Sequence, residues 1–133
     1  MSTMQVDIVT PDRKVFSEQA EMVIARTTEG EIGVLPNHSP LAAMLQISAV
    51  RIKQDGREVT AAISGGFMEV KPESVTILAE SAEFPEEIDV ERAKAAKERA
   101  EKRLREKQEN IDFHRAQLAL NRALNRLEVA KKK

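Results

Sequence analysis

The sequence contains no cysteine, no tryptophan and no tyrosine, and only four phenylalanines. Without cysteine the chain can form neither a disulfide framework nor a thiolate metal site, and a cytosolic location is expected. Because 41% of the residues are apolar but very few are aromatic, the core must be built mainly from aliphatic side chains. A length of 133 residues allows one domain, or one domain with an appendage.

The sequence also lacks long apolar runs. No stretch approaches the ~20 apolar residues that a helix needs to cross a bilayer. Residues 1–5 lack the basic and apolar regions of a signal peptide. We therefore expect no direct membrane insertion, and any association with a membrane must go through another protein.

Common catalytic patterns are missing as well. There is no Gly-x-x-x-x-Gly-Lys-Ser/Thr loop to hold and activate phosphates. Ser64 does not stand in the Gly-x-Ser-x-Gly pattern of a nucleophile elbow. Two histidines, His38 and His114, give no basis for a serine triad or a histidine metal site. A small hydrolase is a further possible function, but no set of residues supports it, and we expect that the chain is not an enzyme.

Charge and turn-forming residues are distributed unevenly. Residues 1–86 carry 7 basic and 13 acidic residues, whereas residues 87–133 carry 14 basic and 9 acidic residues. All five glycines and all five prolines lie at or before Pro85. This split predicts a domain of residues 1–85 and a second domain of residues 86–133 with different partners.

The first part of the chain alternates between short strand patterns and turn signals. Residues 4–9 alternate apolar and polar positions, and Asp55-Gly56 fits a hairpin turn. Further strands are expected at residues 15–16, 20–26, 46–53, 58–64, 67–71 and 75–80. About nine to ten short strands in succession indicate a β-sandwich or a flattened barrel.

The second part is rich in Ala, Glu, Lys and Arg, which are strong helix formers. Pro85 suits the first turn of a helix, residues 107–110 suggest a polar bend, and a second helix is expected from about residue 111 to 129. The two apolar stripes are Ile88, Ala93, Ala96, Ala100 and Leu104, then Phe113, Ala116, Leu120, Ala123 or Leu124, and Leu127. Such thin stripes bury little apolar area and therefore add little stability, since each Å² of buried apolar surface contributes roughly 25 cal/mol. They predict an antiparallel two-helix hairpin that can dock on the sandwich or open onto a partner.

Three arginines of the second helix form a stripe. Arg115, Arg122 and Arg126 fall within about 40° of one line on a helix, away from the centre of the apolar face, so the stripe is expected to be exposed. Guanidinium groups in a row suit phosphates or acidic side chains, although an ordinary solvated helix face is the alternative. Arg92 and Arg99 share a face of the first helix. If the helices pair, these like charges repel unless an anion lies between them, which favours an anion site.

Two motifs in the first part carry most of its glycines. In residues 30–41, Gly-Glu-Ile-Gly-Val-Leu-Pro-Asn-His-Ser-Pro-Leu, the glycines and prolines predict a short strand followed by a rigid turn. Glu31 and His38 are expected on a fixed exposed corner there, either as an ordinary turn or as a contact. The second motif is residues 64–70, Ser-Gly-Gly-Phe-Met-Glu-Val, between two strand patterns.

Both motifs resemble those of the epsilon subunit of the bacterial F-type ATP synthase. The family pattern Gly-Glu-x-Gly-x-Leu-Pro-x-His-x-Pro-Leu is matched at Gly30, Glu31, Gly33, Leu35, Pro36, His38, Pro40 and Leu41. Its pattern Ser-Gly-Gly-Phe-x-Glu-Val is matched over residues 64–70. The order of elements and the length agree too, so the resemblance covers essentially the whole chain. One departure is Asn37, which stands where related sequences often have Gly.

The resemblance implies a non-catalytic rotor subunit in the central stalk of a proton-translocating synthase, at the cytoplasmic face of the cell membrane. The sandwich would couple the gamma subunit to the membrane ring, with Glu31 and His38 as ring contacts. The hairpin would inhibit ATP hydrolysis by extending Arg115, Arg122 and Arg126 to acidic segments of the alpha/beta catalytic head.

The resemblance also implies a regulatory ligand. Bacillus-type members of the family bind ATP between the hairpin and the edge of the sandwich, and their signature Ile/Leu-Asp-x-x-Arg-Ala stands here at residues 88–93. The implied ATP-binding residues are Glu83, Ile88, Asp89, Arg92, Ala93, Arg99, Arg122 and Arg126. Glu83, Ile88 and Asp89 would surround the adenosine, and the arginines would face the phosphates, with the need for Mg²⁺ left open.

The signature also has a simpler interpretation. Asp89 could be a helix N-terminal charge favoured by the macrodipole, with Arg92 as its i,i+3 partner. The pattern recurs at residues 111–116, which shows how easily it arises in a helical sequence.

A nucleic-acid or acidic-protein binding module that uses the basic C-terminal helices is the alternative function. A net charge of +5 over residues 87–133, with nine acidic residues interleaved, is a weak footprint for phosphate binding. Phe113 is the one aromatic residue there that could stack on a base. We therefore expect no nucleic-acid partner.

Overall fold

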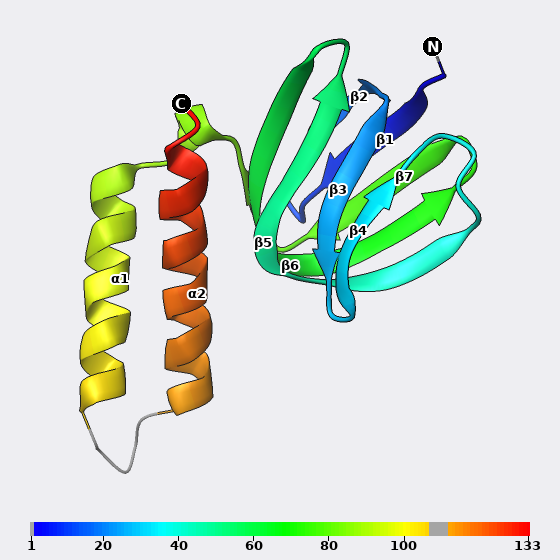
Figure 1. The fold of residues 1–133 in the computed structure, drawn as a ribbon. Helices are drawn as coiled ribbons and strands as arrows, with labels where there is room; N and C mark the ends of the chain where they lie inside the picture. Colours follow the sequence, from blue (N-terminus) through cyan, green and yellow to red (C-terminus); the bar gives the residue numbers. More distant parts are fainter. Residues whose placement is uncertain (1, 107–111) are drawn as a thin grey trace.

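The computed structural model describes residues 2–106 and 112–133, which form eight strands followed by two α-helices (Figure 1). The strands are β1 (Met4–Val9), β2 (Lys14–Ala20), β3 (Met22–Thr27), β4 (Gly30–Val34), β5 (Leu41–Gln54), β6 (Arg57–Lys71), β7 (Ser74–Ala79) and β8 (Ala82–Glu83). The α-helices are α1 (Val90–Arg105) and α2 (Phe113–Ala130). No helix in the described ranges is long and apolar enough to cross a membrane.

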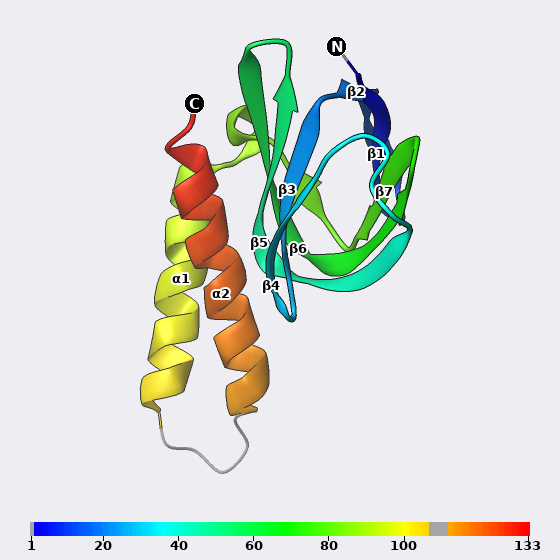
Figure 2. The same cartoon turned by 45° about the vertical axis from the view of Figure 1, so that its right-hand side comes forward.

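All eight strands belong to one sheet. Its order is β2-β1-β7-β6-β5-β3-β4, with β8 paired to β6 beside this path. The β1–β7 pair is parallel and the other pairs are antiparallel. The sheet curls around a core instead of lying flat (Figures 1 and 2). The predicted sandwich followed by a helical hairpin is therefore confirmed.

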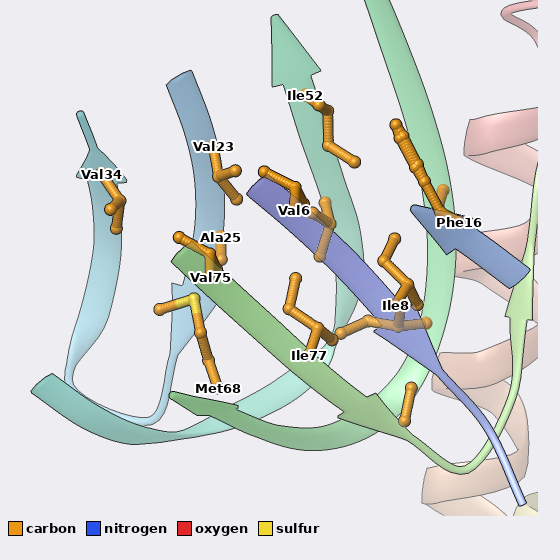
Figure 3. Close-up of a cluster of buried hydrophobic side chains, with 14 of the residues drawn as sticks. Val6, Ile8, Phe16, Val23, Ala25, Val34, Ile52, Met68, Val75 and Ile77 are labelled. Carbon is orange, nitrogen blue, oxygen red and sulfur yellow. The ribbon is translucent and has the colours of Figure 1, made fainter. Parts of the chain in front are cut away.

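The core inside the curled sheet is aliphatic, as the composition predicts. Val6, Ile8, Ile52 and Ile77 have no exposed surface, and Figure 3 shows such side chains pointing into one cluster from several strands. Phe16 is the aromatic member of this buried cluster, and its ring meets that of Phe84 edge to face at 6.1 Å between centroids. Burial of aliphatic surface is thus the main force that closes the sheet.

The predicted number of strands, about nine to ten, is wrong: the described residues form eight, and the expected break between residues 64 and 67 is absent. β5 has 14 residues and β6 has 15, and they pair along nearly their whole length. The pairing passes from Leu45 with Gly66 to Ile47 with Ser64. Gly65 and Gly66 adopt φ values of 92° and 154°, so β6 bends at these glycines without ending.

Gly66 also lies where no side chain fits. A Cβ atom built on Gly66 would come 2.1 Å from the carbonyl oxygen of Leu78 on β7. At Gly56, in the β5–β6 turn, φ is 82° but nothing lies within 4 Å of such an atom. A side chain at Gly56 would therefore meet backbone strain alone, whereas a side chain at Gly66 would meet both backbone strain and a steric collision.

We expect Gly66→Ala to lower the free energy of unfolding of the sandwich by about 3 kcal/mol, because backbone strain and a collision with Leu78 add together. The control Gly56→Ala keeps only the left-handed backbone cost, about 1 kcal/mol. Urea unfolding measures both values. Equal losses in the two variants would contradict the close approach of β6 and β7 at this point.

The two helices form an antiparallel pair (Figures 1 and 2). A short 3-10 helix, Pro85–Glu87, precedes α1, so the first α-helix starts five residues later than Pro85. Buried alanines line the contact between the helices: Ala93, Ala100, Ala116 and Ala123 are each less than 5% exposed. The predicted polar bend at residues 107–110, and the first residue of the expected second helix, lie outside the described residues.

The hairpin rests on the sandwich through α2. Val129 and Ala130 at the end of α2 pack with Ala62 of β6 and with Ile88, which precedes α1. This small buried cluster is separate from the main core. Because its residues are few and small, this cluster buries little apolar area and contributes little to stability.

Candidate functional site

A hollow of about 480 Å³ lies between the two helices and the edge of the sandwich at β8. We call it the arginine pocket, because four of its lining residues are arginines. Its lining consists of Ser81, Glu83, Glu87, Asp89, Arg92, Ala93, Ala96, Arg99, Ala119, Arg122 and Arg126. The hollow thus combines a polar strand edge, an alanine floor from both helices, and cations from both helices.

The arginines come from facing positions of α1 and α2. Arg92 and Arg99 lie on α1, and Arg122 and Arg126 on α2, so the antiparallel pairing brings them to one cavity. Across residues 2–106 and 112–133, the structure pairs none of Arg92, Arg99 and Arg122 with a carboxylate within 4.0 Å. Three guanidinium groups therefore border this hollow without an ion pair among the described residues. The four arginines of the lining outnumber its three carboxylates, which favours an anion there.

The fourth arginine is held by the sandwich. Arg126 donates from Nε to Oε1 of Glu83 at 2.5 Å, and both side chains are 31% exposed. This charge-assisted hydrogen bond joins α2 to β8. Glu83 thus contacts an arginine that the family resemblance assigns to the phosphates, whereas the resemblance assigns Glu83 to the adenosine.

The residues of the signature at 88–93 take different positions. Asp89, Arg92 and Ala93 line the pocket, whereas Ile88 is 2% exposed and packs in the small cluster with Val129. Oδ1 of Asp89 accepts a hydrogen bond from the backbone N–H of Arg92 at 3.1 Å, so this carboxylate caps α1. Seven of the eight residues implied for ATP binding thus border one hollow, and Ile88 lies behind its wall.

The expectation that the arginine stripe of α2 is exposed is wrong for two of its three members. Arg115 is exposed and is not among the lining residues. Arg122 and Arg126 are half-buried, because this side of α2 faces β6 and β8. Helical geometry alone places these residues on one line, but the docking of α2 determines which of them solvent reaches.

Glu31 and His38 do not share one corner. Glu31 is the second residue of β4 and borders a hollow between the sandwich and α2. Its Oε1 lies 3.8 Å from a guanidinium nitrogen of Arg51 on β5. His38 lies beyond the other end of β4, where its Nδ1 meets the carbonyl oxygen of Ser39 at 2.7 Å. In the turn before His38, Asn37 has φ 68° and donates its N–H to the carbonyl oxygen of Pro72 at 2.7 Å, which ties this turn to the β6–β7 connection. Asn tolerates this left-handed conformation better than most residues, which explains why it can replace Gly there.

Sequence reasoning missed Asn125, which fastens α2 to the sheet. Its Nδ2 donates to the backbone carbonyls of Ser48 on β5, at 2.8 Å, and of Ile63 on β6, at 3.2 Å. An asparagine on a helix with many polar residues looks like part of a solvated face, so no local signal marks it. It places Arg122, three residues earlier, and Arg126, the next residue, against the strand edge.

A second hollow, of about 490 Å³, lies on the sandwich and is mainly apolar. Met44, Phe67 and Leu78 contribute to it together with Pro11. Met44 is 57% exposed and Leu78 is 50% exposed, which is unusual for large apolar side chains. An apolar, solvent-facing surface of this kind is typical of a protein contact.

Two family models match the chain along nearly its whole length. The model of the ATP synthase delta/epsilon chain β-sandwich domain matches residues 3–85, and that of the delta/epsilon chain long α-helix domain matches residues 86–131. The chain belongs to the ATP synthase delta/epsilon chain family. It is an epsilon subunit of ATP synthase, and the members it matches are accessory chains of that complex.

Relatives from several bacteria support this assignment. The ATP synthase epsilon chain of Brevibacillus brevis is 64% identical over 98% of this chain and 100% of its own length. That of Halalkalibacterium halodurans is 59% identical over 98% of both chains, and that of Bacillus subtilis is 53% identical over 99% of this chain and 100% of its own length. The resemblance to the epsilon family is therefore confirmed.

Solved structures agree with the fold. A chain in the Euglena gracilis mitochondrial ATP synthase, in a structure of its OSCP/F1/c-ring, superposes with a TM-score of 0.84 at 27% identity, over 98% of this chain and 82% of that one. A chain from the central stalk and c-ring of the Tetrahymena thermophila mitochondrial enzyme superposes with a TM-score of 0.57 at 16% identity. The match covers 98% of this chain and 96% of that one, and it supports the fold alone.

We expect Asn125→Ala to loosen α2 from the sheet, because two hydrogen bonds to β5 and β6 carbonyls are lost. Hydrogen exchange of the α2 amides should become about tenfold faster, which corresponds to about 1.4 kcal/mol, while β1 amides stay protected. The control is Asn121→Ala on the same helix, since Asn121 is exposed and bonds within α2 to Gln117. Equal acceleration in both variants would show that Asn125 does not fasten the helix.

Proposed function

We propose that this epsilon subunit is the regulatory rotor chain of its synthase, with a hairpin that inhibits ATP hydrolysis and that ATP holds in the docked form. The observation that carries the proposal is the convergence of four arginines from both helices on one hollow at the sandwich edge. Only the docked hairpin brings α1, α2 and β8 together there. A ligand in this hollow therefore stabilises the docked form by its own binding free energy.

The chemistry of the pocket fits a nucleoside triphosphate. A volume of about 480 Å³ lies within the usual range of roughly 300–1,000 Å³ for small-molecule sites. The guanidinium groups of Arg92, Arg99 and Arg122, which form no ion pair with the residues that the structure describes, suit phosphate oxygens. The alanines on the floor leave room for a flat base. ATP would be a ligand here and not a substrate.

The same side of α2 supports the inhibitory part of the proposal. In the docked form Arg122 and Arg126 face the sandwich, so they can meet acidic segments of the catalytic head only after α2 leaves β5 and β6. Arg115 is exposed in the docked form as well. Inhibition would then require undocking, and ATP would oppose inhibition by binding only the docked form.

The sandwich would connect the gamma subunit to the membrane ring. The apolar hollow around Met44 and Leu78 is the surface that we assign to gamma, since burial there removes exposed apolar area from water. Glu31 and His38 are the proposed ring contacts, and because they lie at opposite ends of β4 the contact would span this edge strand. These contacts would keep the chain peripheral, at the cytoplasmic face of the cell membrane.

We expect calorimetric titration to show ATP binding by the isolated chain, and an Arg92→Ala, Arg126→Ala double variant to bind at least tenfold more weakly. The reason is the loss of two charge-assisted contacts to phosphate. The control Lys94→Ala, Lys131→Ala removes the same charge from exposed positions outside the pocket and should bind as the parent does. ADP, and ATP with and without Mg²⁺, complete the titration.

Two results would contradict the ATP site. One is a parent chain that binds no ATP at millimolar concentration. The other is a control variant that loses as much affinity as the pocket variant, because binding would then reflect general positive charge. Neither result would touch the membership of the chain in the epsilon family.

We expect an Arg115→Ala, Arg122→Ala, Arg126→Ala variant to relieve inhibition of ATP hydrolysis in the assembled complex, because the contact with acidic segments loses its cations. Steady-state hydrolysis, with the parent and with the Lys94→Ala, Lys131→Ala control in the complex, measures the effect. A several-fold rise in hydrolysis in the triple variant alone is the expected result. Unchanged inhibition would rule out this contact.

A further inference from the structure

The hollow that Glu31 borders lies on a different side of α2 from the arginine pocket. It has a volume of about 570 Å³, and residues of α2, β3, β4 and β5 line it. Between the pairs Ile24–Arg51 and Thr27–Leu45, β5 has more residues than β3, so the two strands separate there. Figure 2 shows α2 running alongside this part of the sheet. We call this space the β3–α2 hollow.

Part of the β3–α2 hollow is apolar. Ile47 and Ala49 of β5 are half-buried there, and Leu124 of α2 is 40% exposed. Large apolar side chains that stay exposed beside a hollow are typical of a surface that a partner covers. This part of the hollow therefore fits an apolar side chain of a partner.

Charged side chains surround the apolar part. Arg51 pairs with two carboxylates, Glu31 at 3.8 Å and Glu58 at 3.7 Å. Among the residues that the structure describes, neither Arg26 of β3 nor Lys132 after α2 has a carboxylate within 4.0 Å. Hydrogen-bond acceptors of a partner, either a carboxylate or free backbone carbonyls, would match these two cations.

One wall of the hollow belongs to the hairpin. Leu124 and Glu128 come from α2 and Lys132 follows it, whereas Arg26 and Glu31 belong to the sandwich. The hollow therefore exists only while α2 is docked on β5 and β6. A partner that fills it contacts both domains at once and stabilises the docked form by the free energy of that contact.

We infer that the β3–α2 hollow receives a polar turn of a membrane-ring subunit, so that the ring contact includes α2 and favours the docked hairpin. The inference rests on the proposed ring contact at Glu31, which borders the same hollow. The turn places an apolar side chain against Ile47 and Leu124, and a carboxylate or free carbonyls near Arg26 and Lys132. By linkage, docking of the hairpin raises the affinity for the ring by the factor by which the ring favours docking.

The test compares two exposed apolar residues of α2. Leu124→Ala removes apolar contact inside the hollow, and we expect the full chain to bind a rotor of gamma and membrane ring about fivefold more weakly. The matched control is Phe113→Ala. Phe113 is 48% exposed and is not among the lining residues, so binding should stay within about twofold of the parent. Binding to the immobilised rotor in detergent, without nucleotide, gives these affinities.

Binding to gamma alone is the second reference. The β3–α2 hollow shares no lining residue with the apolar hollow that we assign to gamma, so Leu124→Ala should bind gamma alone as the parent does. Equal losses of rotor affinity in Leu124→Ala and Phe113→Ala would overturn the inference. A loss of the same size with gamma alone would overturn it too, because the ring would then not be the partner of Leu124.

A Glu31→Ala variant keeps this inference apart from the proposed ring contact. Weaker rotor binding in Glu31→Ala, with parent-like binding in Leu124→Ala, would leave the ring contact in place and overturn the inference. Parent-like binding in both variants would overturn the ring contact as well.

The coupling to docking has its own measurement. We expect ATP to raise the affinity of the parent for the rotor about fivefold, and to leave its affinity for gamma alone unchanged. Unchanged rotor affinity in a chain that binds ATP by calorimetry would overturn the coupling. If the chain binds no ATP, the proposed nucleotide site is overturned, and the comparison of Leu124→Ala with Phe113→Ala decides the inference.

Discussion

The docking of α2 on β5 and β6 is the contact on which the functional geometry depends. It consists of two hydrogen bonds from Asn125, the ion pair of Arg126 with Glu83, and a small apolar cluster at the end of α2. Each of these contributes on the order of 1 kcal/mol, and an ion pair this exposed contributes at the low end. The sandwich, by contrast, is closed by a continuous aliphatic core. The two parts therefore differ in stability, and the contact between them is the one that a ligand or partner of ordinary affinity can shift.

The alanine contact between α1 and α2 has a related consequence. Small side chains let the helix backbones come close, so that arginines of both helices reach one hollow. The same small side chains bury little apolar surface, so the contact between α1 and α2 adds little stability to the hairpin. Larger residues would stabilise the pair but would separate the helices and widen the hollow. Close approach of cations and modest stability thus have a single physical origin.

The sequence predicts the order of elements, the aliphatic core and the grouping of arginines, because these follow from periodicity and composition. It does not predict that β6 continues through Gly65 and Gly66, since glycine pairs usually mark a turn and only the packing against β7 shows why a bend suffices. It also misses Asn125, whose partners are backbone carbonyls far away in the sequence. The prediction that Arg122 and Arg126 are exposed is wrong for the same reason. Helical periodicity shows which residues share a face of the helix, but not which face another domain covers.

If the arginine pocket binds ATP and the same arginines inhibit the catalytic head, the two ligands compete for Arg122 and Arg126. Coupling of this kind needs no pathway through the protein, because one set of side chains cannot occupy two places. Linkage then makes the effect reciprocal: ATP weakens the contact with the head by the factor by which that contact weakens ATP binding. Glu83 enters the same balance, since it pairs with Arg126 in the docked form. The docked state would therefore be favoured to some degree without nucleotide, and ATP would deepen an existing preference instead of creating it.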